Sequence, residues 1–136
     1  MEIDLALEHF RHNHRAVLAT RRRDGRPQLS PVLQAVTDDG RIVVSTRAVA
    51  MKARNARRDP EVSICAINDG FFGPWVQVDG SATIIELPQA MPVLRSYYLQ
   101  ISGEHPDWDE YERAMVAEGR VVIAIMPVSA GPDAAG

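Results

Sequence analysis

Residues 47–60 (RAVAMKARNARRDP) carry five basic side chains and a single acid, Asp59, near the end of the segment. Lysine and arginine side chains gathered in this way bind anions, above all phosphate and carboxylate groups. The stretch Ala48 to Arg58 is rich in alanine, lysine and arginine, which favours a helix, and Asp59-Pro60 ends it. The segment therefore predicts a basic helix that either binds an anion or presents a solvated charged face.

The anion-site interpretation places the ligand at the start of this helix, where Thr46 is expected to be the N-cap. A helix N-terminus presents unpaired backbone N–H groups and the positive end of the helix dipole. Helical side chains lean toward the N-terminus, so Lys52 can reach over the first turn. Arg47 lies beside the cap and Arg54 one turn further on, but Lys52 and Arg54 are expected to project from different faces. A phosphate with further negative charge nearby is the expected anion.

The alternative interpretation is a solvated basic face that pairs with the acidic segment 104–118, which has six acids and one arginine. Runs of charge along a helix are usually solvent faces. The residue pattern by itself therefore favours this alternative.

The histidine and cysteine residues do not indicate a metal site or a catalytic nucleophile. His9, His12 and His14 have a spacing that could hold a metal, but no acid or cysteine nearby completes a ligand set. A polar helix face is the preferred interpretation, and no metal is expected. Cys65 lies among apolar neighbours in VSICAI, which favours an inert buried thiol over a nucleophile.

Length and composition bound the organisation of the chain. With 136 residues and 46% hydrophobic residues, we expect a single domain over 1–128 followed by a disordered tail at 129–136. A net charge of −3 argues against a general nucleic-acid-binding protein. No stretch has the length and apolarity of a membrane span or a signal peptide, so a cytoplasmic protein without membrane partners is expected.

The elements that must position the basic segment are short strands with a few helices. Strands are predicted at 16–22, 28–36, 41–46, 61–67, 75–87 and 120–127, and helices at 3–12, 48–58, 88–103 and 105–119. Turn signals at Asp24-Gly25 and 38–40 indicate antiparallel hairpins, and Gly80 predicts a bulge or a close approach. Closure of the sheet would remove exposed edges, which favours an α+β fold built on an antiparallel barrel.

Six segments, in order and at matching spacings, resemble the pyridoxamine-5′-phosphate-oxidase-like split β-barrel family. They are VLAT, DGRPQLSPV, IVVST, KARNARRDP, WVQVDGSATI and ISGEHPDWDEYERAMV. KxRNxRRDP together with GEHPDWDEY is most similar to the actinobacterial members that bind the deazaflavin coenzyme F420. The resemblance extends over most of the chain and implies a six-stranded antiparallel split β-barrel, the FMN-binding split barrel, with peripheral helices.

The same resemblance implies a set of cofactor-binding residues. In the family, the phosphate end of a flavin or deazaflavin lies where the third strand meets the basic helix, and a second subunit completes the site. The residues implicated near the phosphate are Ser45, Thr46, Lys52, Arg54 and Asn55; those near the ring are Leu18, Ala19, Thr20, Gln28, Ser30 and Pro31, with Trp75 from the second subunit. The resemblance therefore favours the anion-site interpretation, with the basic residues facing the phosphate and oligoglutamate tail of F420.

The function that the resemblance implies is an F420-dependent oxidoreductase, which transfers a hydride to a small electron-poor acceptor such as an enone or a quinone. Two alternatives stay open: an FMN-binding, flavin-dependent relative, and a non-catalytic F420 carrier, because no side chain stands out as a catalytic acid or base. The apolar strand segments 82–87 and 121–126 need cover on both faces. A two-fold homodimer with cofactor sites at its interface is expected.

Overall fold

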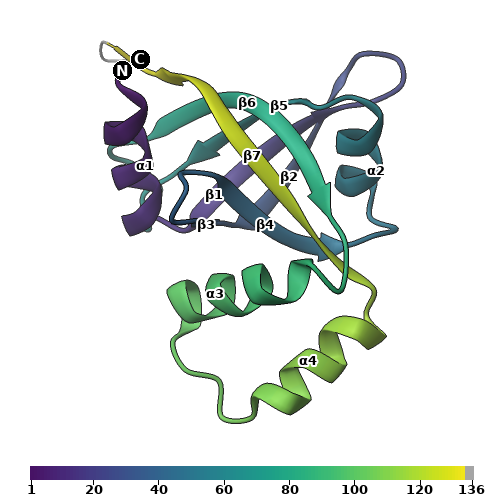
Figure 1. The fold of residues 1–136 in the computed structure, drawn as a ribbon. Coiled ribbons are helices and arrows are strands. Elements are labelled where there is room, and N and C mark those ends of the chain that lie inside the picture. The colour runs from purple at the N-terminus through teal and green to yellow at the C-terminus, as the bar shows by residue number, and fades with distance from the viewer. Residues whose placement is uncertain (134–136) are drawn as a thin grey trace.

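The computed structural model describes residues 1–133, in which four helices and seven strands follow one another (Figure 1). In chain order they are α1 (Ile3–His12), β1 (Arg15–Arg21), β2 (Pro27–Leu33), β3 (Ala35–Val36), β4 (Ile42–Arg47), α2 (Met51–Arg58), β5 (Glu61–Ala66), β6 (Val76–Ile85), α3 (Ala90–Ser102), α4 (Trp108–Ala117) and β7 (Arg120–Gly131). None of the helices in this part of the chain combines the length and apolarity needed to cross a bilayer.

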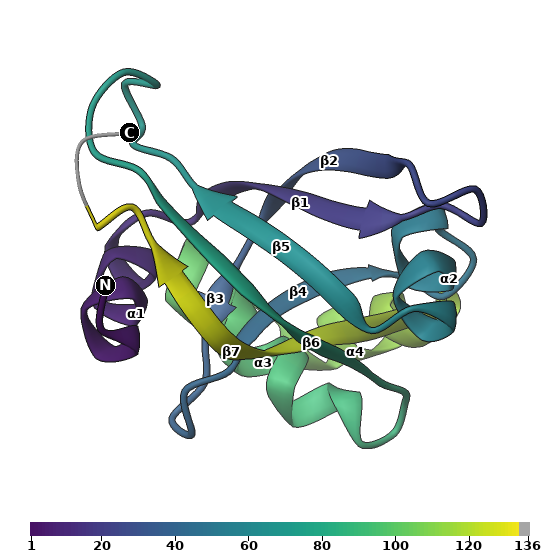
Figure 2. The same ribbon diagram turned by 90° about the horizontal axis from the view of Figure 1, so that it is seen from above.

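All seven strands belong to one antiparallel sheet with the order β2-β1-β5-β6-β7-β4-β3. The strands at the two ends of this order, β2 and β3, are separated in the chain only by Gln34. The sheet therefore curls back on itself around a common interior (Figures 1 and 2). This confirms the predicted α+β fold on an antiparallel barrel.

The barrel has seven strands rather than six because the predicted strand 28–36 breaks at Gln34. This residue is fully buried, and its backbone N–H donates to the carbonyl of His14. Its side-chain Nε2 donates to the carbonyls of Phe10 (2.9 Å) and Asn13 (2.7 Å). Because these bonds replace the ladder at Gln34, the segment before it (β2) pairs with β1 and the segment after it (β3) pairs with β4. The sequence contains no turn residue here that would reveal the break.

The predicted irregularity in β6 is confirmed, with a register shift between Asp79 and Gly80. A Cβ atom at Gly80 would lie 2.5 Å from the carbonyl oxygen of Met126 in β7. Only glycine permits this close approach of two backbones. The Asp24-Gly25 turn between β1 and β2 is also present, and Gly25 has the positive φ (86°) that such a turn requires.

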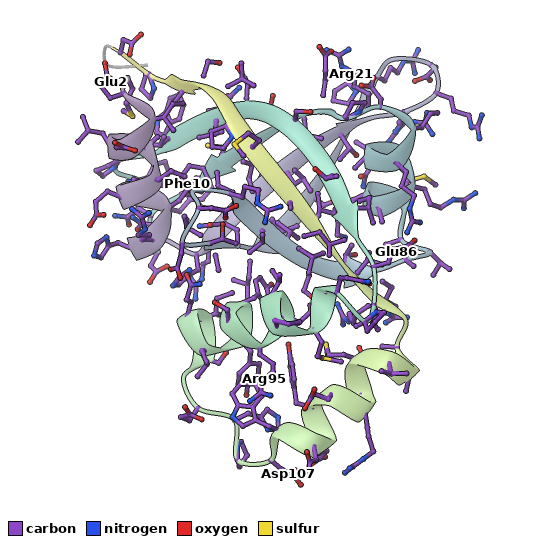
Figure 3. All side chains as sticks on the ribbon, in the orientation of Figure 1. Glu2, Phe10, Arg21, Glu86, Arg95 and Asp107 are labelled. Carbon is purple, nitrogen blue, oxygen red and sulfur yellow. The ribbon has the colours of Figure 1, made fainter. Side chains whose placement is uncertain are left out.

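The four helices occupy three places around the barrel. In Figure 1, α1 lies against one end of the barrel and α2 against the other, whereas α3 and α4 lie side by side below it. Phe10 projects from α1 into the fully buried interior (Figure 3). Arg95 projects from α3 toward α4, where its guanidinium lies 4.7 Å from the ring centre of Trp108.

Two boundaries differ from the prediction, and one difference concerns the site. Thr46 is not a helix N-cap, because β4 continues through it and α2 begins only at Met51. At the C-terminal end, β7 continues to Gly131, which stands opposite Gln77 of β6. The first residues of the segment predicted to be a disordered tail are thus strand, while residues 134–136 lie outside the described residues.

Candidate functional site

Most cations of this protein have a carboxylate partner, and those that lack one are not scattered. Of the 15 lysine and arginine residues, eight lie within 4 Å of an aspartate or glutamate oxygen. Within residues 1–133, the side chains without such a partner are Arg22, Arg23, Arg47, Lys52, Arg54, Arg58 and Arg113. All of these except Arg113 line two grooves that flank α2. Such a surplus of positive charge favours the binding of an anion.

The first groove lies where β4 ends and α2 begins, and we call it the Lys52 groove. It has a volume of about 470 Å³ and is open to solvent. Three cations and three hydroxyl groups stand along it. Its lining residues are Pro31, Val32, Leu33, Ser45, Thr46, Arg47, Val49, Ala50, Lys52, Tyr97 and Arg120. Four predicted phosphate- or ring-binding residues (Pro31, Ser45, Thr46 and Lys52) therefore meet here.

The sheet register adds charge to the Lys52 groove. Arg47 and Arg120 stand directly opposite each other in the β4–β7 ladder, an arrangement that is destabilising for two like charges. Glu118 lies 2.8 Å from the guanidinium of Arg120, but Arg47 has no carboxylate partner among the described residues. The N-cap of α2 is Ala50, whose side chain cannot accept a hydrogen bond. The groove thus combines excess positive charge with an uncapped helix start, as an anion site requires.

Tyr97 of α3 also lines the Lys52 groove. Its hydroxyl donates to the carbonyl of Leu33 at 3.1 Å, which ties α3 to the end of β2. Burial raises the pKa of the Tyr97 hydroxyl, so the phenol is neutral at physiological pH. No local signal indicates that Tyr97 or Arg120 belongs to the site, because each joins it only through tertiary structure.

Four further predicted site residues form one buried polar network beneath α2. Asn55 donates to the Thr20 hydroxyl (3.2 Å), and Thr20 donates to the side-chain oxygen of Gln28 (3.3 Å). The other end of the Gln28 amide donates to Ser30 (3.0 Å). Thr20 and Asn55 are each only 1% exposed. These side chains hold α2 against β1 and β2, and Thr20 and Asn55 are almost completely covered.

The second groove lies on the opposite side of α2, and we call it the arginine groove. It has a volume of about 820 Å³ between the β1–β2 hairpin and the helix. Its lining residues are Arg22, Arg23, Asp24, Gln28, Met51, Arg54, Asn55, Arg57 and Arg58. Lys52 and Arg54 line different grooves, which confirms that they project from different faces. Arg54 therefore lines the arginine groove and not the Lys52 groove.

The pairing of α2 with the acidic segment 104–118 is not found. Within the described chain, the only carboxylate near an arginine of α2 is Glu86, which lies 2.7 Å from Arg57. The acids of the acidic segment that pair with arginines, Glu112 and Glu118, instead contact Arg95 and Arg120. Within the described part of the protein, Arg57 is therefore the one basic residue of α2 with a carboxylate partner, and Lys52, Arg54 and Arg58 have none.

The remaining ring-binding candidates divide between the two faces of β1. Leu18 is fully buried in the barrel core, whereas Ala19 points to the outer face. Across that face Ala19 stands opposite Ser63, and Ser63 opposite Asp79. A hydrogen bond from the Ser63 hydroxyl (2.6 Å), with others from Gln77 and Ser129, lowers the pKa of Asp79. An ionised carboxylate thus stands in an open groove of about 790 Å³ that Ala19 also lines.

Several large apolar side chains are exposed on or beside the same outer face. They are Leu29, Leu33, Trp75, Met126 and Val128, of which Val128 is 72% exposed. Trp75 precedes β6 next to the start of β1, while α2 lies at the end of β1. The loop before β6 and α2 accordingly lie at opposite ends of the barrel (Figure 2). Trp75 is therefore separated from α2, whose first residues line the Lys52 groove.

The cysteine and two of the histidines considered as reactive residues have structural surroundings. Cys65 is half-buried in β5, and burial raises the pKa of its thiol, which agrees with an inert cysteine. The rings of His12 and His14 lie 2.9 and 2.8 Å from two different backbone carbonyls, those of Glu8 and Gln34.

Comparison with known proteins finds a matching family model and similar solved structures. Residues 3–131 match the family model described as pyridoxamine 5′-phosphate oxidase. The structure is similar to that of the conserved hypothetical protein Rv2991 from Mycobacterium tuberculosis, with 28% identity, a TM-score of 0.78, and coverage of 96% of this chain and 82% of that one.

Two more distant solved structures share the fold. An F420 reductase has 22% identity and a TM-score of 0.65, with 88% of this chain and 90% of that chain covered. The heme storage protein HutZ from Vibrio cholerae has 19% identity and a TM-score of 0.69, with 96% of this chain and 94% of that chain covered.

Proposed function

Because the chain belongs to the pyridoxamine 5′-phosphate oxidase family, we propose that it is an oxidoreductase that uses the deazaflavin coenzyme F420. The proposed acceptor is a small electron-poor molecule such as an enone or a quinone. It gains a hydride from the reduced coenzyme and a proton from solvent. The observation that carries the proposal is the gathering of unpaired cations in the Lys52 groove and around α2.

The residues of the Lys52 groove fit a phosphate group. Arg47 and Lys52 have no carboxylate partner among residues 1–133, so a phosphate would neutralise charge that the fold leaves uncompensated. The Ser45 hydroxyl and the uncapped start of α2 supply neutral donors beside them. We assign Lys52 and Arg47 to the phosphate, with Ser45 and Thr46 at the wall of the groove.

The ring system is proposed to lie on the outer face of the sheet, between the Lys52 groove and Ala19. Pro31 and Ala19 supply small apolar surface there, and Gln28 stands at the neighbouring edge. When bound, the deazaflavin supplies the hydride chemistry, and the protein positions the ring and limits access of water. The buried Thr20–Asn55 pair supports this wall rather than touching the cofactor.

A homodimer belongs to the same proposal. The outer face of the sheet presents exposed apolar side chains, including Leu29 and Val128, that a second copy would cover. Trp75 lies at the opposite end of the barrel from α2, and we assign it to the cofactor site of a two-fold partner. Light scattering should report a dimer at micromolar concentration. A monomer that still binds the cofactor would refute this part of the proposal.

The experiment that tests the function follows oxidation of reduced F420 by the purified protein with a panel of enones and quinones. Acceptor-dependent oxidation supports the proposal. Saturable binding of F420 without oxidation by any acceptor would identify a carrier instead. FMN and hemin are titrated in parallel, and tighter binding of either would overturn the choice of F420.

A further inference from the structure

The carboxylate of Asp79 has no cationic partner, although it stands on the outer face of the sheet among neutral side chains. The described strands contain one other acid, Glu61, which lies 2.9 Å from the guanidinium of Arg21. The groups that donate to Oδ1 of Asp79 are both neutral: the Ser63 hydroxyl at 2.6 Å and the Gln77 amide at 3.0 Å. These bonds fix the position of an ionised carboxylate without supplying a counter-charge.

The sheet register surrounds Asp79 with small side chains. Ser63 of β5 and Ser129 of β7 stand directly opposite it, on the strands to either side of β6 (Figure 2). The ladder shifts between Asp79 and Gly80, so that Val128 has no partner in β6. This bulge leaves two successive residues, Val128 and Ser129, exposed beside the carboxylate. Bulges of this kind re-aim side chains and are frequent next to functional sites.

The groove that Asp79 lines, which we call the Asp79 groove, is opposite in sign to the Lys52 groove. Its charged lining residues are Arg21, Glu61 and Asp79. Because Arg21 pairs with Glu61, the charge that remains uncompensated is the negative charge of Asp79. Pro27 and Val128 add apolar surface to the same groove. A positive charge attached to an apolar group matches both features.

Asp79 also retains the capacity to accept hydrogen bonds from a ligand. An ionised carboxylate has about four lone-pair sites. Within residues 1–133, Oδ2 has one contact, with the Ser129 hydroxyl at 3.4 Å, which is long for a hydrogen bond between two oxygens. We propose that the Asp79 groove binds an organic cation, a protonated amine or a guanidinium attached to an apolar group, whose N–H groups donate to Oδ2 of Asp79. The inference stands whichever cofactor the protein uses.

The dimer proposed above makes a counter-cation more necessary. A second copy that covers Leu29 and Val128 would also remove water from Asp79, and an ionised carboxylate without a cationic partner is costly to bury. At about 790 Å³ the groove is far larger than one guanidinium group, so an arginine of the second copy would not fill it. A small organic cation can neutralise the charge and occupy the volume together.

Nuclear magnetic resonance titration of the full-length protein tests this site. The probes are benzylamine, which is protonated at neutral pH, benzyl alcohol and benzoate, which share one ring and differ in charge. Each is added at constant ionic strength to isotopically labelled protein without cofactor. Benzylamine should shift the backbone amides of residues 62–64, 78–81 and 128–129, while those of residues 45–47 stay in place. Benzyl alcohol should bind roughly three- to thirtyfold more weakly, and benzoate should leave the amides of the groove in place.

Substitution of Asp79 by asparagine provides the matched comparison, because it removes the charge and keeps the size of the side chain. Asp79→Asn should weaken benzylamine binding roughly three- to thirtyfold, since an exposed charge contributes a modest amount. Asp38→Asn is the control, because Asp38 lies in the turn before β4, outside the lining of the groove. It should leave binding unchanged. The thermal midpoint of each variant establishes that it is folded.

Four results would each overturn the inference. They are no shift at millimolar benzylamine, shifts centred outside the Asp79 groove, equal affinity for benzyl alcohol, or equal affinity of the two variants for benzylamine. If Asp79→Asn weakens self-association in light scattering while benzylamine does not bind, the partner of Asp79 is a second copy of the chain and the inference is wrong. None of these results depends on whether F420 is turned over, so this inference and the proposed function can fail separately.

Discussion

Substitution of Lys52 by alanine should weaken F420 binding strongly without affecting the fold. The side chain is half-buried in the Lys52 groove and has no carboxylate partner in residues 1–133, so its removal breaks no ion pair of the described protein. The loss of a charge-assisted hydrogen bond to phosphate costs roughly 1.5–3 kcal/mol. This corresponds to about a ten- to hundredfold increase in Kd.

The assay is a fluorescence titration of F420 with the wild-type protein and the variant, together with the thermal midpoint of each. The free energy of unfolding should change by less than about 0.5 kcal/mol, because a lysine at a helix start opposes the helix dipole. Arg113→Ala is the matched control, since Arg113 is the unpaired cation of the described chain that lies away from α2. Equal effects of the two substitutions on Kd would refute the reasoning, because any loss of positive charge would then suffice.

Three further predictions concern the scaffold. Asn55→Ala removes buried hydrogen bonds beneath α2 and should lower the free energy of unfolding by about 1–3 kcal/mol in urea denaturation; an unchanged midpoint would contradict the supporting role. Gly80→Ala would bring a methyl group within 2.5 Å of the Met126 carbonyl and should lower the thermal midpoint, at a cost of about 1–3 kcal/mol; wild-type stability would contradict the close approach. Hydrogen bonds, first that from Ser63, lower the pKa of Asp79 in the folded state. The stability from Asp79 is thus complete above the pKa of an unfolded aspartate, about 4, and is lost as the pH falls below it. Asp79→Asn should flatten the acid side of the stability curve, and an unaltered curve would contradict this assignment.

Local sequence patterns predict most of the helices, strands and turns of this fold. β-branched runs, hairpin turns and helix-favouring residues predict most elements, and Gly80 marks the bulge because a glycine inside a strand signals close backbone contact. The break at Gln34 has no such signal. A buried glutamine amide replaces the ladder bonds there, and its partners come from α1 and the segment after it. Thr46 illustrates the opposite failure, because a residue type favoured at helix starts lies inside a strand.

The candidate site can be predicted from the sequence only in part, because several of its residues come together only through tertiary structure. The basic segment and the separation of Lys52 from Arg54 follow from helical geometry alone. The pairing of Arg47 with Arg120 depends on the register of β4 and β7, and Tyr97 arrives from α3. Contacts between residues that are far apart in the chain cannot be predicted from the local amino-acid composition. Equally, nothing local reveals that Thr20 and Asn55 are used beneath the helix rather than at its surface.

The most direct test of the central claim is a crystal structure of the protein bound to F420. The phosphate of the coenzyme should lie within hydrogen-bonding distance of Lys52 and Arg47, at the end of β4. The ring should extend along the outer face of the sheet toward Ala19. A phosphate bound anywhere outside the Lys52 groove would contradict the assignment of this groove to the cofactor.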